Sequence, residues 1–166
     1  MKLAIIGATG KTGNAVLRIA LDKGINVTAV VRNAAKLTEN VPVIEKDVFN
    51  LTTTDLKNFD AVICTFASAK KSDYPRVNQH LVDTLTGTNA RLIVVGSGAT
   101  LYADDKHNKT VGDKLPIFMR NSSKNHMKAR QILQDSQINW TYMALALVDE
   151  VEHPKNERHL MTVAWK

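Results

Sequence analysis

The sequence predicts an α/β protein of the Rossmann type, with a doubly wound, mostly parallel sheet and helices on both faces. Short, continuously apolar runs alternate with segments of helical periodicity, as expected of strands that are buried on both faces. A glycine-rich turn also follows the first of these runs. Right-handed crossovers then favour the strand order 3-2-1-4-5-6. The length favours a single domain over residues 1–166.

The expected elements follow one another with short connections. Strands are predicted at residues 2–6, 26–32, 41–48, 60–67, 91–98 and 140–148. Helices are predicted at residues 12–23 and 74–85, from Ser122 or Ser123 through Asp135, and, as a short one capped by Thr53 or Thr54, through Lys57. We expect residues 102–122 to form a loop, and the tail is a candidate for one more strand.

Two of the helices carry an apolar stripe at helical spacing. In the first predicted helix the stripe is Ala15, Val16, Ile19 and Ala20, and Gly24 follows as a stop signal. In the helix at residues 74–85 the stripe is Val77, Leu81, Val82 and Leu85. These residues are the expected contacts between the helices and the sheet.

Composition narrows the class of function. The net charge is +6, yet the basic residues are dispersed and the longest basic run is Lys70-Lys71, which favours an anionic small ligand over nucleic acid. No apolar run approaches the roughly 18 residues of a membrane span. The single cysteine, Cys64, fits a reducing compartment, and the histidines lack the spacing of a metal site. We therefore expect a cytoplasmic protein without a metal.

The stretch GATGKTG, residues 7–13, admits two interpretations, because both ATP-binding P-loops and dinucleotide-binding loops cradle phosphate. A P-loop needs an outer glycine five residues before Gly10, and Ile5 stands there. The alternative pattern, Gly7, Gly10 and Gly13, directly follows a strand and opens a helix, as a dinucleotide loop must. The sequence therefore favours a dinucleotide over ATP.

Each loop residue has an expected role. Gly7 permits the tight turn, Gly10 lets the backbone approach a pyrophosphate, and Gly13 lets the helix pack against the sheet. The helix start offers free N–H groups to the phosphates, and Lys11 and Thr12 add a charge and a hydroxyl. Thr9 completes this set of predicted cofactor-binding residues.

The ends of the later strands predict the rest of the cofactor site, because ligands bind beyond the carboxyl ends of parallel strands. NAD enzymes carry an acid about 20 residues past the loop, whereas this chain has Arg32 and Asn33. A guanidinium matches a 2′-phosphate, so NADP(H) is favoured; a plain surface arginine is the alternative. Asp47 and Val48 are expected to flank the adenine. Near the nicotinamide ribose and pyrophosphate we expect Thr65, Phe66 and Ala67.

The motifs IIGATGKTG, Val-Val-Arg-Asn, Lys-Asp-Val, LIVVGSGA and LQDSQINWTYM resemble those of the atypical short-chain dehydrogenases/reductases. More narrowly, the chain is similar to the NAD(P)H-binding proteins grouped with NmrA-like regulators and with flavin and biliverdin-IX-beta reductases. The resemblance covers about residues 1–148 and implies an NADP-binding Rossmann domain with a small substrate cleft. The sequence departs from the family after the sixth strand, where ALALVDEVEHPKNERHL implies a short C-terminal substrate region.

The sequence offers fewer candidates for catalytic residues than for cofactor-binding residues. Tyr102 and Lys106 match the Tyr-x-x-x-Lys spacing of the wider superfamily, but they fall in a predicted loop. Ser97 follows the fifth strand and is expected to hydrogen-bond a substrate oxygen or to form a Gly-Ser-Gly turn. His126 resembles a histidine of the flavin-reductase branch; a surface histidine is the alternative. We take Ser97 and His126 as the catalytic candidates.

Two functions remain open at this point. The first is an NADPH-dependent oxidoreductase of a small planar acceptor such as a flavin or a quinone, whose chemistry is carried by the cofactor. The second is a non-catalytic, NADP(H)-sensing regulatory protein that binds a protein partner. The short C-terminal region leaves three alternatives open for the substrate side: it is shallow, it is completed by the partner subunit of a homo-oligomer, or it is truncated.

Overall fold

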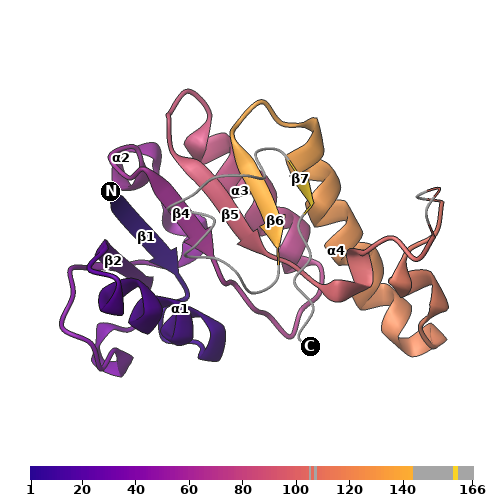
Figure 1. The fold of residues 1–166 in the computed structure, drawn as a ribbon, viewed down its shortest axis with the longest axis horizontal. Coiled ribbons are helices and arrows are strands. Elements are labelled where there is room, and N and C mark those ends of the chain that lie inside the picture. Colours follow the sequence, from indigo (N-terminus) through magenta and orange to yellow (C-terminus); the bar gives the residue numbers. More distant parts are fainter. Residues whose placement is uncertain (105, 107, 144–158, 161–166) are drawn as a thin grey trace.

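A parallel sheet forms the middle layer of the computed structural model, which describes residues 1–104, 106, 108–143 and 159–160 (Figure 1). Its seven strands lie in the order β3-β2-β1-β4-β5-β6-β7. The strands are β1 (Lys2–Ile6), β2 (Asn26–Val31), β3 (Val43–Glu45), β4 (Ala61–Cys64), β5 (Arg91–Val95), β6 (Trp140–Met143) and β7 (His159–Leu160). The predicted order 3-2-1-4-5-6 is confirmed, and β7 adds a parallel strand beside β6. The rest of the predicted strand 140–148 lies outside the described residues.

The hydrophobic core has two parts, one on each face of the sheet, because successive side chains of each strand point to opposite faces. Leu3 and Ile5 of β1 pack with α1 (Lys11–Asp22), whereas Ala4 and Ile6 face a second cluster. That cluster includes side chains of α3 (Asp73–Leu85) and α4 (Ile117–Asp135), which pack against each other. Because successive side chains of a strand point to opposite faces, the helices cover both sides. The predicted α/β fold class is thus confirmed.

The first predicted stripe is wrong in part. Val16 and Ala20 are buried as expected, but Ala15 is exposed. Leu17 is buried in place of Ile19, whose side chain is 49% exposed. The buried face of α1 runs through Gly13, Val16, Leu17 and Ala20 because the loop glycine, rather than Ile19, sets how the helix meets the sheet. The stripe predicted for α3 is buried throughout.

The helix starts differ from the predictions, by one residue for α1, α2 and α3 and by a longer stretch for α4. The short helix α2 (Thr53–Leu56) begins one residue early, because Thr52 and Asp55 form a reciprocal capping box. Helix α4 begins at Ile117, directly after Pro116, not at Ser122 or Ser123. Ser123 is buried within the helix, where a Cβ on Gly112 would overlap its side chain. The apolar residues of its first turn are consecutive in the sequence rather than at helical spacing, so the sequence did not indicate a helix there. Ile117 is 83% exposed and Met119 is 43% exposed.

The described helices do not include a membrane-spanning candidate. None of them is both long and apolar enough to cross a bilayer. The described His, Cys, Asp and Glu side chains likewise form no group of three or more that could hold a metal ion.

Candidate cofactor-binding site

The turn from β1 into α1 is built for close backbone contact. Gly7 has φ +81°, and a Cβ there would lie 2.9 Å from Thr65 Oγ1. A Cβ on Gly13 would overlap the Gly7 carbonyl oxygen and lie 2.7 Å from the same Thr65 hydroxyl oxygen. Thr65 in turn donates from Oγ1 to the Ile6 carbonyl at 2.8 Å. Glycines are therefore required where the loop, the helix and the segment after β4 meet.

The start of α1 is open to an anion. Gly10 is the N-cap and supplies no side-chain hydrogen bond, and the first turn carries no acidic residue. Thr9, Gly10, Lys11 and Thr12 are all exposed. The first N–H groups of a helix have no intrahelical partner, and the helix dipole places positive potential there. This end of α1 therefore has the donors and the field that a phosphate group needs.

A cleft of about 520 Å³ opens beyond the carboxyl ends of β1, β2, β3 and β4. The predicted cofactor residues that line it are Gly7, Thr9, Gly10, Arg32, Asn33, Asp47, Val48, Thr65, Phe66 and Ala67. Lys11, Thr12 and Gly13 of the predicted set are not among its lining residues. They form the first turn of α1 directly behind the loop. The structure thus brings most of the predicted residues to one cleft.

Cations gather at the β2–β3 end of this cleft. Arg32 is exposed just after β2, and Lys36 and Lys46 also line the cleft. The nearby polar residues already have local roles: Asn33 Oδ1 accepts from the Ala35 N–H at 2.9 Å, and Asp47 Oδ1 accepts from the Phe49 N–H at 3.0 Å. Arg32 and Lys36 are therefore the cations that this end offers to an anionic ligand.

Sequence reasoning did not assign Lys46 to the site, although its position beside Asp47 at the end of β3 was a usable signal. Lys46 Nζ contacts both carboxylate oxygens of Asp55, at 2.7 and 2.8 Å. Hydrogen bonding from Lys46 holds the pKa of Asp55 below its ordinary value, helped by Thr52. Lys46 is consequently shared between the cleft wall and the cap of α2.

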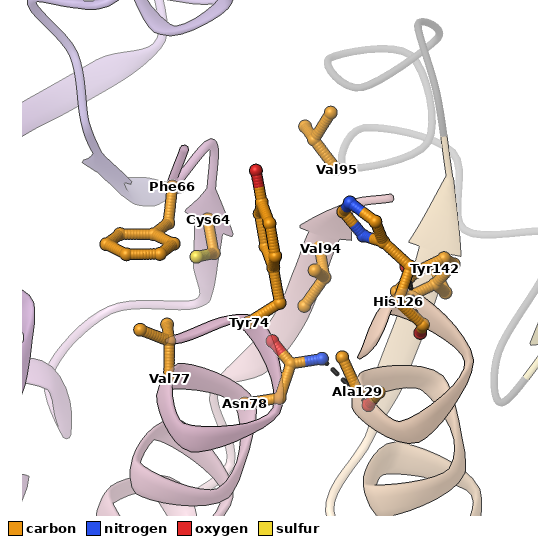
Figure 2. Close-up of a pocket in the computed structure, with 10 residues that line it drawn as sticks. All are labelled: Cys64, Phe66, Tyr74, Val77, Asn78, Val94, Val95, His126, Ala129 and Tyr142. Carbon is orange, nitrogen blue, oxygen red and sulfur yellow. Dashed lines mark hydrogen bonds between the residues drawn. The ribbon is translucent and has the colours of Figure 1, made fainter. Parts of the chain in front are cut away.

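A second, smaller cavity of about 10 Å³ lies between the ends of β4 and β5 and the helices α3 and α4 (Figure 2). It shares Phe66 with the cleft. Figure 2 shows the Tyr74 ring between Phe66 and the imidazole of His126. The Tyr74 and His126 ring centroids are 4.0 Å apart at an interplanar angle of 35°. His126 therefore borders the cavity next to the cleft rather than open solvent alone.

Burial sets the protonation of the groups around this cavity. Desolvation, with a smaller effect of Lys71, lowers the pKa of His126, so its imidazole is neutral at pH 7. Burial raises the pKa of Tyr142 to about 12 and that of Cys64 to about 11. The phenol and the thiol thus keep their protons at neutral pH, and the Cys64 thiolate is too scarce to act as a nucleophile.

Ser97 is not among the residues that line either cavity. Its side chain accepts from the Ala99 N–H at 3.3 Å and caps a short 3-10 turn. The Tyr142 hydroxyl lies between the two candidates: it donates to the His126 carbonyl at 3.5 Å, and a backbone hydrogen bond from Ser97 opposes the rise of its pKa.

The Tyr-x-x-x-Lys spacing has no helical context in the structure. Tyr102 forms an isolated bridge with Thr110, and its hydroxyl accepts from Arg130 Nη2 at 2.6 Å. Arg130 is buried and also donates to the Thr100 carbonyl at 2.6 Å. Tyr102 therefore helps to anchor the segment after β5 onto α4.

Comparisons with known proteins agree with this geometry. A family model described as NAD(P)H-binding matches residues 7–162. The uncharacterized protein YwnB of Bacillus subtilis (strain 168) is 30% identical, with 98% of each chain covered. Among solved structures, a "putative NADH-flavin reductase" from Streptococcus pneumoniae TIGR4 superposes with a TM-score of 0.92 at 26% identity, covering 100% of both chains.

A more distant structure shares the fold. ChuY, an anaerobillin reductase from Escherichia coli O157:H7, gives a TM-score of 0.66 at 19% identity, over 87% of this chain and 72% of that one. The family match, together with the glycine loop and the cleft, indicates that the ligand is a nicotinamide cofactor. The chain belongs to the NAD(P)H-binding family of atypical short-chain dehydrogenases/reductases.

Proposed function

We propose that the protein is an NADPH-dependent reductase of a small planar acceptor such as a flavin or a quinone. The observation that carries the proposal is the continuity of the site. The glycine-lined cleft ends in cations on one side and shares Phe66 with the cavity that His126 borders on the other. This arrangement suits a phosphorylated dinucleotide whose nicotinamide end meets an aromatic pocket.

The loop residues fit such a cofactor. Side chains in place of Gly7 or Gly13 would fill the space against Thr65, and the uncapped first turn of α1 offers N–H groups to a pyrophosphate. A bound nicotinamide would supply the hydride. The chain would bind the phosphates through the loop and place the reacting end near Phe66, while the neutral His126 would offer a hydrogen bond to the acceptor or a proton at lower pH.

A preference for NADPH over NADH is supported by the charge of the β2–β3 end. Arg32 stands where NAD enzymes carry an acid, and Lys36 lines the same wall. The lining carboxylate of Asp47 accepts the Phe49 N–H, so it has a structural role of its own. A guanidinium can pair with a 2′-phosphate through two parallel hydrogen bonds.

A flavin acceptor is supported by the likeness to the Streptococcus pneumoniae protein named as an NADH-flavin reductase. Hydride transfer to a flavin or a quinone also needs little acid–base assistance, since the cofactors carry the chemistry. The limited machinery around His126 is thus sufficient for this reaction class.

The test is a spectrophotometric assay of cofactor oxidation. Purified protein is given NADPH or NADH with FMN, FAD or a soluble quinone, and the absorbance of the reduced nicotinamide is followed. We expect acceptor-dependent oxidation that is faster with NADPH at subsaturating cofactor. Tight NADPH binding without turnover on any of these acceptors would overturn the reductase and leave the NADP(H)-sensing regulator. Equal rates with NADH would overturn the cofactor preference.

A further inference from the structure

The segment after β4 and the imidazole of His126 are joined by one side chain. Tyr74, in the first turn of α3, donates from its hydroxyl to the Ser68 carbonyl at 3.3 Å. The same hydroxyl oxygen accepts from the Ser68 N–H at 3.4 Å. Residues Thr65 to Ala67, directly before Ser68, line the cofactor cleft. The phenol end of Tyr74 is therefore attached to the strand end that borders the cofactor.

The ring end of Tyr74 contacts the candidate catalytic histidine. Its centroid lies 4.0 Å from that of His126 and 6.0 Å from that of Phe66, with an edge-to-face geometry. Figure 2 shows the three rings side by side, with His126 coming from α4. The described backbone around Tyr74 is well fixed, because Asn78, one turn later on α3, donates to the Ala129 carbonyl of α4 at 2.9 Å.

We propose that Tyr74 is a positioning residue that couples the cofactor-binding segment after β4 to the orientation of the His126 imidazole. The inference rests on the proposed function, in which His126 faces the acceptor. The ring stack restricts the rotation of the imidazole, and the Ser68 hydrogen bonds make the position of the ring depend on the segment that touches the cofactor. Occupation of the cleft is thereby transmitted to the histidine.

The surroundings of His126 define which groups act on its titration. Tyr74 and Lys71 approach it from α3 and the turn before it, whereas Cys64 and Tyr142 line the same cavity from β4 and β6. The thiol and the phenol of Tyr142 remain protonated near neutral pH. Lys71 is tethered to the Ser68 carbonyl at 3.3 Å, so it belongs to the same segment as the Tyr74 contact.

Two variants separate the two ends of Tyr74. Tyr74→Phe keeps the ring and removes the hydroxyl, while Tyr74→Ala removes both. Tyr102→Phe is the matched control, because it removes a tyrosine hydroxyl that bonds to Arg130 and not to the cleft. The measurements are NMR of the His126 imidazole, assigned with His126→Gln, and calorimetric titration with NADP⁺.

In the wild type and in Tyr74→Phe, we expect the His126 ring protons to show an upfield ring-current shift. In Tyr74→Ala this shift should fall by half or more, and the pKa of His126 should rise toward its ordinary value as water reaches the ring. Tyr74→Phe should bind NADP⁺ about two- to tenfold more weakly, the loss expected for one neutral hydrogen bond. NADP⁺ should shift the His126 signals in the wild type and much less in Tyr74→Phe, with Tyr102→Phe behaving as the wild type.

The outcomes distinguish this proposal from the proposed function. An imidazole signal that is the same in Tyr74→Ala as in the wild type would overturn the stack, whatever the enzyme does. Wild-type affinity and a wild-type NADP⁺ response in Tyr74→Phe would overturn the coupling. If the protein shows the ring-current shift and the NADP⁺ response but oxidises no NADPH with any acceptor, the coupling by Tyr74 would stand and the proposed reductase activity would be overturned.

Discussion

The cleft at the β1–α1 loop, which we propose as the cofactor side, and the cavity at His126, which we propose as the acceptor side, are built in different ways. Around the β1–α1 loop, backbone atoms form the site. Its glycines allow contacts that any side chain would obstruct, and the helix start supplies N–H groups. Around His126, side chains from α3, α4, β4 and β6 make the site. The glycine loop, residues 7–13, is one contiguous stretch, whereas the acceptor side depends on the packing of distant segments.

Gly13→Ala should break the cofactor side most severely. The added methyl group overlaps the Gly7 carbonyl and approaches Thr65, so the loop must shift at a cost of about 1–3 kcal/mol. We expect NADPH affinity to fall about 10- to 100-fold, as measured by calorimetry. Gly24→Ala is the control: it has φ +69° but nothing within 4 Å. It should lower stability and leave affinity intact; a similar loss of affinity in both variants would contradict the account.

His126→Gln tests the acceptor side. We expect turnover to fall about tenfold with NADPH affinity unchanged. This loss is smaller than the usual effect of removing a general acid, because reduction of the acceptor needs little acid–base assistance. Wild-type turnover should rise as the pH falls through and below about 6.5, since burial lowers the pKa of His126 and the protonated form is scarce at neutral pH. Lys128→Gln, an exposed change on the same helix, is the control.

A variant with the wild-type pH profile would remove His126 from the proton pathway. A parallel loss of NADPH affinity would instead assign the histidine to cofactor binding, and the comparison between the two sides would need to be redrawn.

Asp55→Asn tests the carboxylate that pairs with Lys46 at the edge of the cleft. The change removes the carboxylate that caps α2 and holds Lys46, and should lower the free energy of unfolding by about 1 kcal/mol at pH 7. Because the pKa of Asp55 is lowered in the folded protein, the wild type has the higher free energy of unfolding at pH values above the ordinary aspartate pKa of about 4. This advantage should vanish as the pH falls through the folded-state pKa. Denaturant unfolding against pH tests this, and an advantage that persists at pH 2 would contradict it.

The smallest effect is expected at Cys64. Its thiol lines the small cavity beside His126, but a pKa of about 11 leaves about one thiolate in a thousand at pH 8. Iodoacetamide should therefore label the native protein far more slowly than the urea-unfolded protein, as followed by mass spectrometry. Comparable labelling rates would show that the cavity opens to solvent.

The two sides also differ in how much of them could be predicted from the sequence. Gly7 directly follows the first predicted strand, and Arg32 and Asp47 lie at the carboxyl ends of the predicted strands 26–32 and 41–48, so the topology takes them to one cleft. In the structure β2 and β3 end earlier, at Val31 and Glu45. Nothing in the sequence pairs Tyr74 with His126, because that contact depends on how α3 and α4 pack. The early start of α4 was not predicted because the apolar residues of its first turn are consecutive and are not at helical spacing.

The candidate catalytic pair shows the same limit. Ser97 was predicted from its place after β5, yet its side chain caps the following turn and Tyr142 lies between it and His126. Lys46 was overlooked although it lies at the carboxyl end of β3, where the rule that placed Asp47 applies equally. Backbone-determined positions were therefore predictable, and side-chain partners from distant segments were not.

The central claim, a phosphorylated nicotinamide cofactor held by the cationic end of the cleft, is tested most directly by one calorimetric experiment. NADPH and NADH are titrated into the wild type and into Arg32→Ala. We predict that the wild type binds NADPH more tightly, and that the variant loses about 10- to 100-fold of NADPH affinity, as expected for charge-assisted hydrogen bonds, with NADH affinity unchanged. Equal binding of both cofactors by the wild type, or an unchanged preference in Arg32→Ala, would contradict the account.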